Sequence, residues 1–158
     1  MTERLTHVDA SGAAHMVDVS DKAVTVRTAR ARATLEAAPA TLRAIRDATL
    51  AKGDALSVAR IAGILAAKRT GDLIPLCHPL PLDHADVAIT VHDDHILVET
   101  VARTTARTGV EMEAMTAAAL AALTLYDMAK AIDRAMRVTS IELVEKSGGK
   151  SGSWRREG

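Results

Sequence analysis

The sequence predicts an α+β domain in which helices and antiparallel hairpins share one sheet. The stretch 111–136 contains no Gly or Pro and is dominated by Ala, Leu and Met, which makes it the strongest helix prediction in the chain. Two segments, 87–91 and 96–100, alternate apolar and polar residues on either side of the turn-like residues 92–94, which predicts a hairpin. A length of 158 residues with no internal repeat or linker favours one domain over 1–158.

The first elements of the chain are predicted as a strand followed by two helices. Segment 22–35 is rich in Val, Thr and Arg, and the alternation in its first half favours a strand, while the Ala and Arg of its second half leave a helix open. A short helix is predicted from Pro39 to about residue 50. Asp54 is a plausible N-cap for a further helix over 55–68, where apolar residues recur at helical spacing.

The remaining elements are predicted as a loop, a last strand and a mobile end. Three of the four prolines fall within 70–83, and proline cannot donate to a strand ladder, so this segment is predicted as an ordered loop. Segment 138–144 is predicted as the final strand. The Gly-rich basic segment 146–152 is predicted as a loop or mobile tail, and we expect 153–158 to be mobile.

Composition excludes several classes of function. Lys and Arg number 20, as do Asp and Glu, so charge gives no reason to expect a nucleic-acid or membrane partner. Tyr126 and Trp154 are the only aromatic residues, too few to stack on a nucleic-acid strand. A single cysteine, Cys77, fits a reducing compartment, and the N-terminus does not look like a signal peptide. We therefore expect a cytoplasmic protein.

The most prominent charged motif is the pair Asp127 and Lys130. Residues three apart share one face of a helix, so these two side chains can form an ion pair. Segment 114–128 is apolar nearly all round, which predicts that the helix and its charged pair are buried. A buried charge pair is costly and is often functional. A surface ion pair of little energetic weight stays open as the alternative.

A second motif is the proline-bounded segment 73–80, which contains Cys77 and His78. Proline restricts the residue before it, so His78 is held rigidly. Adjacent side chains usually point in different directions, which argues against a nucleophile and base dyad; Cys77 is better read as a small buried hydrophobic residue. His78 is open to two interpretations, a functional group or a core histidine with satisfied hydrogen bonds.

Lysines near glycines form two further candidate sites. Lys52 precedes a helix start and could add positive charge to an anion site, although an ordinary solvated loop lysine fits equally. Residues 149–151 mimic the end of a P-loop, but Val144 stands where that motif needs glycine and no helix can follow. A flexible basic loop over phosphates and a disordered tail both stay open. The histidines show no zinc signature, so no metal is expected.

Eight ordered motifs, which span about 5–152, carry a resemblance to one known family. They are 5–7, 14–19, 59–63, 67–70, 72–80, 108–114, 121–130 and 146–152. Together they resemble cyclic pyranopterin monophosphate synthase, the MoaC family of molybdenum cofactor biosynthesis. The resemblance implies a ferredoxin-like fold with helices on one face of the sheet. It also implies a hexamer, built as a trimer of dimers with active sites at the dimer interface.

The resemblance further implies a lyase reaction and a set of residues. The cyclised GTP derivative, 3′,8-cyclo-7,8-dihydroguanosine triphosphate, would be converted to cyclic pyranopterin monophosphate with release of pyrophosphate and without a cofactor. The residues implied as catalytic are Asp127, Lys130, Lys52 and His78. The residues implied to contact substrate are Leu76, Cys77, His78, Met112 and Glu113, and the lysines suited to stabilise phosphate charge include Lys146 and Lys150.

Two other classes of function remain as rivals. A non-catalytic nucleotide- or pterin-binding module would keep the phosphate-facing lysines without needing Asp127 and Lys130 buried together. A structural oligomer, in which the apolar helix is an assembly seam, predicts no pocket near His78. Pyrophosphate release from the cyclised substrate separates all three.

Overall fold

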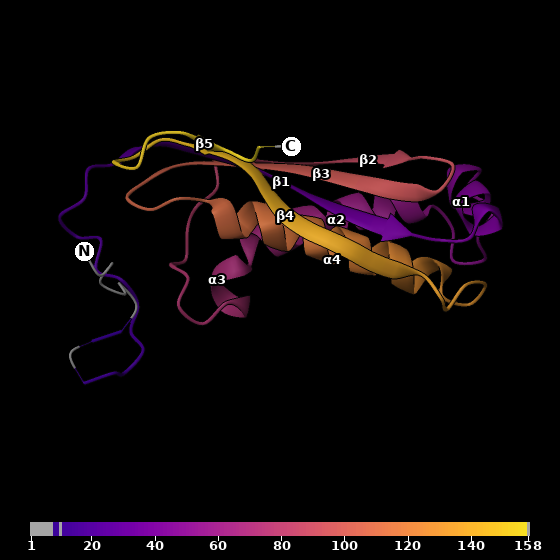
Figure 1. Cartoon of the computed structure of the whole chain (residues 1–158), viewed down its shortest axis with the longest axis horizontal. Helices are drawn as coiled ribbons and strands as arrows, with labels where there is room; N and C mark the ends of the chain where they lie inside the picture. Colours follow the sequence, from indigo (N-terminus) through magenta and orange to yellow (C-terminus); the bar gives the residue numbers. More distant parts are fainter. Residues whose placement is uncertain (1–7, 10, 158) are drawn as a thin grey trace.

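The computed structural model describes residues 8, 9 and 11–157. Its sheet has the strand order β2-β3-β1-β4-β5, and every neighbouring pair is antiparallel. The strands are β1 Thr25–Glu36, β2 His84–Val91, β3 His95–Ala106, β4 Arg137–Ser147 and β5 Trp154–Arg155. The helices are α1 Pro39–Arg46, α2 Ala55–Lys68, α3 Thr70–Leu73 and α4 Glu111–Ala129. Helices α2 and α4 run along one face of the sheet, so the α+β prediction is confirmed and the arrangement is consistent with a ferredoxin-like fold (Figure 1).

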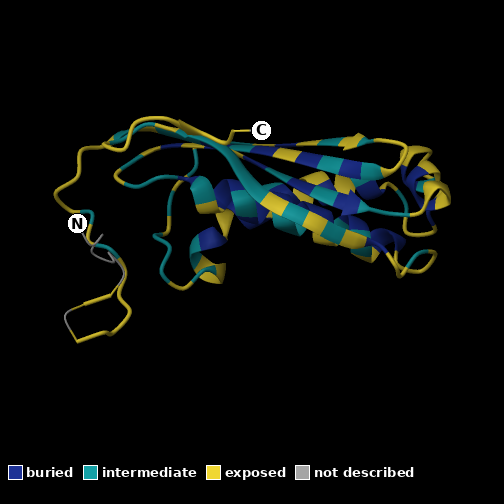
Figure 2. Ribbon diagram, viewed as in Figure 1, coloured by how far each residue is buried: buried dark blue, intermediate teal, exposed yellow. Residues whose placement is uncertain are grey.

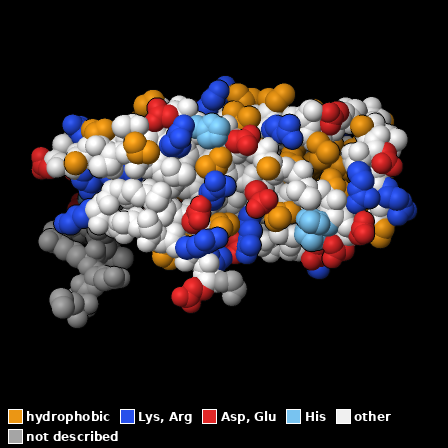
Figure 3. Space-filling view, turned by 90° about the horizontal axis from the view of Figure 1, so that it is seen from above, with side chains coloured by type: hydrophobic (Ala, Val, Ile, Leu, Met, Phe, Trp, Pro, Cys, Tyr) orange, Lys and Arg blue, Asp and Glu red, His pale blue; other side chains and the backbone are white. Residues whose placement is uncertain are grey.

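The central strand β1 divides the sheet into a core face and an open face. Alanines and Leu35 of β1 alternate towards the helices and are buried. Arg30 and Arg32 point to the opposite face, where they pair with Glu145 at 3.0 Å and Glu142 at 2.9 Å. Figure 2 shows the buried residues gathered between sheet and helices, and Figure 3 shows the mixture of charges on the open face.

The two long helices pack closely because small residues line their contact. An added Cβ at Gly63 of α2 would lie 3.0 Å from the carbonyl oxygen of Ala117 and 3.3 Å from the Cβ of Ala121, both on α4. The same position would be 2.8 Å from a methyl group of Val87 in β2. Glycine at this position therefore lets α2 approach α4 and the sheet together.

Most of the predicted helices and strands are present, and the first two helices differ in how well their bounds agree with the prediction. Helix α2 has the predicted bounds, and Asp54 caps it by accepting a hydrogen bond from the Ser57 backbone N–H at 3.1 Å. Segment 22–35 is a strand from Thr25 onwards, so the helical alternative for its second half is wrong. Helix α1 ends at Arg46 instead of near residue 50, because Ala48 adopts a positive φ of 53° that a helix cannot contain.

Two further boundaries differ from the predictions. The segment predicted as a loop over 70–83 begins with the short helix α3. Helix α4 ends at Ala129 instead of near Met136, because the chain turns so that Asp133 can accept hydrogen bonds at the start of α1, from the backbone N–H of Ala38 at 2.9 Å and the hydroxyl of Thr41 at 3.1 Å.

The C-terminal end is more regular than predicted. Strand β4 extends to Ser147, so Lys146 lies in a strand and not in a loop. Strand β5 then pairs with β4, which places Trp154 opposite Lys146 within the segment expected to be mobile. No helix among the described residues is long and apolar enough to cross a membrane.

Candidate functional site

A cavity of about 390 Å³ lies between the proline-bounded segment 73–80 and the start of α4. Five residues singled out from the sequence line it: Leu76, Cys77, His78, Met112 and Glu113. Val17, Val19 and Lys22 approach from the segment before β1, and Thr108, Gly109 and Glu111 from the segment that leads into α4. The structure therefore brings together residues that lie far apart in the sequence.

The loop that carries His78 is fastened to the rest of the fold. The buried hydroxyl of Thr104 in β3 donates a hydrogen bond to the Pro81 carbonyl at 2.6 Å. Gly71 of α3 packs against Pro79, where an added Cβ would be 3.0 Å from the proline Cα. The His78 Nε2 lies 2.7 Å from the Val17 carbonyl oxygen, which can only accept, so Nε2 carries the proton. In the neutral ring Nδ1 is then left as an acceptor.

Glu113 is a buried acid on the cavity wall. Only 4% of the residue is exposed. Burial, reinforced by the nearby Glu111 carboxylate, raises the pKa of Glu113 from 4.5 to about 7. A carboxyl group tuned to this range can either donate or accept a proton near neutral pH.

Cys77 has the opposite character from an activated thiol. Burial, with a smaller contribution from Glu113, raises the pKa of this thiol above its ordinary value of 9.0. The only cysteine of the chain is therefore a neutral wall residue of the cavity at neutral pH.

The charged pair predicted on α4 forms, but it is not buried in this chain. Asp127 accepts from Lys130 Nζ at 2.7 Å and from Lys52 Nζ at 2.8 Å. The side chains of Asp127, Lys130 and Lys52 are 55%, 51% and 44% exposed, so the prediction of burial is wrong. Leu123, four residues before Asp127 on the same face of α4, is exposed as well, so this face of the helix reaches solvent although it carries an apolar residue.

These three side chains form what we call the lysine–aspartate cluster. Lys52 Nζ also donates to the Asp127 backbone carbonyl at 2.8 Å, one of the carbonyls near the end of α4. Hydrogen bonds from Lys130 and then Lys52, followed by their charges, lower the pKa of Asp127 from 3.8 to about 2. The same aspartate raises the pKa of Lys130. The cluster is thus one carboxylate held between two ammonium groups.

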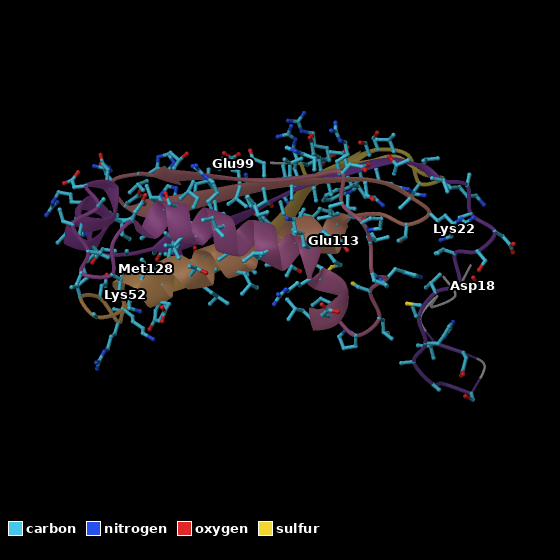
Figure 4. The ribbon with its side chains drawn as sticks, turned by 180° about the vertical axis from the view of Figure 1, so that it is seen from behind. Asp18, Lys22, Lys52, Glu99, Glu113 and Met128 are labelled. Carbon is cyan, nitrogen blue, oxygen red and sulfur yellow. The ribbon has the colours of Figure 1, made fainter. Side chains whose placement is uncertain are left out.

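The His78 cavity and the lysine–aspartate cluster lie at opposite ends of α4. Figure 4 shows Glu113 and Lys22 towards one end of the molecule and Lys52 and Met128 at the other. The 14 residues from Glu113 to Asp127 correspond to about 21 Å along a helix. Within one chain, three of the residues implied as catalytic, Asp127, Lys130 and Lys52, are brought together, and His78 lies apart from them at the other end of α4.

The two C-terminal lysines, Lys146 and Lys150, have different surroundings. Lys146 Nζ lies 3.1 Å from a Glu111 carboxylate oxygen and donates to the Ser151 hydroxyl at 3.1 Å. Lys150 lines a different cavity, which it shares with Lys22 and Arg27. Both lysines are thus at the same end of the molecule as His78.

Comparison with known proteins identifies the family. The model of the MoaC family matches residues 16–149. This chain belongs to the MoaC family. It is 59% identical over 153 residues to cyclic pyranopterin monophosphate synthase 1 of Mycobacterium tuberculosis H37Rv, covering 96% of this chain and 90% of that protein. It is also 56% identical to the cyclic pyranopterin monophosphate synthase of Thermomicrobium roseum over 155 residues, 97% of this chain and 93% of that protein.

A third relative gives the same picture. The cyclic pyranopterin monophosphate synthase of Streptomyces coelicolor is 53% identical over 154 residues, which cover 98% of this chain and 91% of that protein. The resemblance read from the sequence motifs is therefore confirmed at the level of the family. The motif 5–7 lies outside the described residues.

Sequence reasoning missed several residues of the site in this MoaC family member. Val17, Lys22, Glu111 and Arg27 line the two cavities, but none stands in a pattern that distinguishes it from an ordinary strand-flanking residue. The available signals were two motifs of the resemblance, 14–19, which contains Val17, and 108–114, which contains Glu111. Within residues 8, 9 and 11–157, no group of three or more His, Cys, Asp or Glu side chains is arranged to hold a metal ion.

Proposed function

We propose that this chain is the lyase that converts 3′,8-cyclo-7,8-dihydroguanosine triphosphate to cyclic pyranopterin monophosphate, with release of pyrophosphate, in molybdenum cofactor biosynthesis. The observation that carries the proposal is identity of 53–59% over nearly the whole chain to relatives that are named for making this product. The cavity around His78 and Glu113 supports it, because rebuilding a purine into a pterin requires repeated proton transfers.

Two cavity groups are suited to those proton transfers. Glu113, with a pKa of about 7, exists in both protonation states at neutral pH. His78 presents Nδ1 as an acceptor because the Val17 carbonyl fixes the proton on Nε2. Leu76, Cys77 and Met112 form the less polar wall against which a flat ring can rest.

The lysine–aspartate cluster supplies positive charge. Asp127 stays ionised across the neutral range and positions the ammonium groups of Lys52 and Lys130. Ammonium groups held in place can stabilise negative charge that develops on substrate oxygens. Lys146 and Lys150 would add to this at the phosphate end.

A working site would need both ends of α4, and we propose that two subunits supply them. A hexamer built as a trimer of dimers would bring the cluster of one chain to the His78 cavity of its neighbour. The exposed apolar residues Val58, Ile61 and Leu65 of α2, with Leu123 of α4, support assembly because they leave an apolar stripe on the helix layer. Contact with another subunit would also desolvate the cluster. A cytoplasmic location is part of the same proposal.

The test is release of pyrophosphate from the cyclised substrate. The wild-type protein should release it, and Asp127→Asn and Lys130→Ala should lose turnover. Both variants should keep the secondary structure of the wild type by circular dichroism, because these groups are exposed in the isolated chain and contribute little to its fold. Asp93→Asn, which breaks an exposed ion pair with Arg46, is the matched control and should retain activity.

The rivals predict other results in the same assay. A binding module would take up the substrate and release nothing, and a structural oligomer would do neither. A well-folded Asp127→Asn protein with near-normal turnover would remove Asp127 from the mechanism.

A further inference from the structure

One carboxylate joins two parts of the chain that flank the lysine–aspartate cluster. Asp133, in the turn after α4, accepts at Oδ2 from the backbone N–H of Ala38 at 2.9 Å and from the Thr41 hydroxyl at 3.1 Å. Its other oxygen, Oδ1, accepts from the backbone N–H of Ala135 at 3.1 Å. These contacts hold the start of α1 against the turn after α4 at one end of the molecule (Figure 1).

The start of α1 depends on this carboxylate for its cap. The N-cap residue, Ala38, has no side chain that can accept a hydrogen bond, and the first turn of α1 contains no acidic residue. A carboxylate at a helix N-terminus satisfies backbone N–H groups and interacts favourably with the helix dipole. The hydrogen bond from the Ala38 N–H, followed by that from Thr41, lowers the pKa of Asp133, so this group is ionised at neutral pH.

Lys52 is connected to α1 by short-range hydrogen bonds. The backbone N–H of Thr49 donates to the Ala44 carbonyl of α1 at 3.0 Å. The backbone N–H of Gly53 donates to the Leu50 carbonyl at 2.9 Å, and Lys52 lies inside the turn that this bond closes. The position of the Lys52 backbone therefore depends on the position of α1.

Lys130 is connected to Asp133 at the end of α4. The backbone N–H of Asp133 donates to the Ala129 carbonyl at 3.2 Å, and the Tyr126 hydroxyl donates to the Arg134 carbonyl at 3.2 Å. Lys130 thus lies between the last turn of α4 and a bridge that reaches α1. The two lysines of the cluster are carried by the two segments that Asp133 joins.

The cluster alone is a weak way to fix this arrangement. Its three side chains, Lys52, Asp127 and Lys130, are all about half exposed, and exposed ion pairs contribute little free energy. Asp133 is half-buried, and two of its three donors are backbone N–H groups, which lose no side-chain entropy when they are bonded. The bridge is therefore better suited than the cluster to set the distance between the two segments.

We propose that Asp133 is a positioning residue for the lyase reaction, because its bridge to α1 sets the separation of Lys52 from Asp127 and Lys130. This role rests on the proposed function and adds to it a residue that lies outside both the His78 cavity and the cluster. Asp133 itself would touch no substrate. It acts through the two ammonium groups, which must be held to within about 0.5 Å to stabilise developing charge well.

The kinetics of pyrophosphate release from the cyclised substrate separate positioning from simple capping. Asp133→Ala removes all three hydrogen bonds and should lower kcat roughly tenfold to a hundredfold, with KM changed by less than about threefold. Asp133→Asn keeps an oxygen for the Ala38 N–H and the Thr41 hydroxyl and should recover most of kcat. The matched control is Asp94→Ala, which removes an exposed carboxylate that accepts from its neighbour His95, and it should keep the wild-type kcat.

Nuclear magnetic resonance of the lysine side chains tests the bridge without any substrate. The hydrogen bond and the charge of Asp127 raise the pKa of Lys130 above 10.5. In Asp133→Ala the loosened pair should bring this pKa back towards 10.5, whereas Asp133→Asn should keep most of the increase. Thr41→Val removes one hydrogen bond without changing the charge, so it should lower kcat in the same direction by a smaller factor.

The outcomes separate this inference from the proposed function. An unchanged kcat in a folded Asp133→Ala protein with a lower melting temperature would show a cap that is only structural and overturns the inference. Equal losses in Asp133→Ala and Asp133→Asn would show that charge matters and the bridge does not, which overturns it as well. If Asp133→Ala does not fold, an unchanged kcat in Thr41→Val overturns it.

The measurement on Lys130 also covers a protein that lacks the proposed activity. If the wild type fails to turn over the cyclised substrate, a pKa of Lys130 that falls in Asp133→Ala and is retained in Asp133→Asn supports the bridge and overturns the proposed reaction. If that pKa is the same in the wild type and in folded Asp133→Ala, the bridge does not position the cluster, whatever the turnover.

Discussion

Glu113 holds a proton that the unfolded chain would give up. Its pKa is about 7 in the folded protein and 4.5 for an unperturbed glutamate. Between pH 4.5 and about 7, the native protein therefore binds more protons than the unfolded one. The free energy of unfolding must then fall as the pH rises from about 4.5 to about 7, and the full cost of the buried carboxylate is present above that range. Burial of Glu113 therefore lowers the free energy of unfolding at neutral pH.

Glu113→Gln should remove this part of the pH dependence. We expect the free energy of unfolding of the wild type to fall by about 3 kcal/mol more than that of the variant between acidic and mildly alkaline pH, since each pKa unit corresponds to about 1.4 kcal/mol. Urea unfolding of both proteins at pH 5 and pH 8, at one protein concentration, measures the difference. Curves that shift in parallel would show that Glu113 titrates normally.

Cys77 should be dispensable for the reaction. Its pKa is raised by burial and by Glu113, so the thiol stays neutral and is a poor nucleophile. Cys77→Ala should cost on the order of 1 kcal/mol through packing and keep most of the turnover. Complete loss of activity at unchanged stability, or inactivation by thiol labelling that substrate blocks, would contradict this.

At the scale of elements, the sequence predicts the end of a helix well where the contacts that fix that end come from nearby residues. Helix α2 could be bounded from the sequence because Asp54 supplies its own N-cap within four residues. The end of α4 could not, because the deciding contact joins Asp133 to the start of α1, far away along the chain. Strand β5 was missed for the same reason, since its two residues are a strand only through pairing with β4.

The contact between α2 and α4 should tolerate no added methyl group at Gly63. Alanine would improve helix propensity by about 1 kcal/mol. Against this, the new Cβ would press on the Ala117 carbonyl and on Val87, and overpacking of this kind costs about 1–3 kcal/mol. The backbone carbonyl cannot move without α4, so we expect Gly63→Ala to lower the free energy of unfolding. Chemical denaturation measures this, and a more stable variant would show that the helices can separate freely.

At the scale of the whole molecule, the sequence located one half of the site better than the other. The resemblance implied that residues 76–78, Met112 and Glu113 contact substrate, and in the structure they line one cavity. Asp127 and Lys130 were expected to be buried, yet they are half exposed, because periodicity predicts which face of a helix is apolar but not how far other elements cover it. Lys22 and Arg27 could not be predicted as cavity residues for a different reason. The cavity that they line exists only because the turn after β4 folds back over them.

A site shared between subunits should show complementation. We expect Glu113→Ala and Asp127→Ala each to be inactive, and we expect partial activity after the two are unfolded together and reassembled, since some interfaces then receive both intact residues. The 21 Å estimated between the two groups along α4 is the physical reason. Light scattering should establish that mixed oligomers form, and each variant reassembled alone is the control. Mixed oligomers without recovered activity would rule out the shared site.

The position of β1 in the middle of the sheet sets the order of events on the ribosome. Thr25–Glu36 leaves the exit tunnel first among the strands, but its two neighbours begin only at His95 and Arg137. Until then the apolar side of β1 has no lasting cover, and pairings between distant segments form slowly. Synthesis must therefore proceed through β4 before the core can close, so nascent chains that stall before β4 should depend on chaperones and be degraded early by proteases.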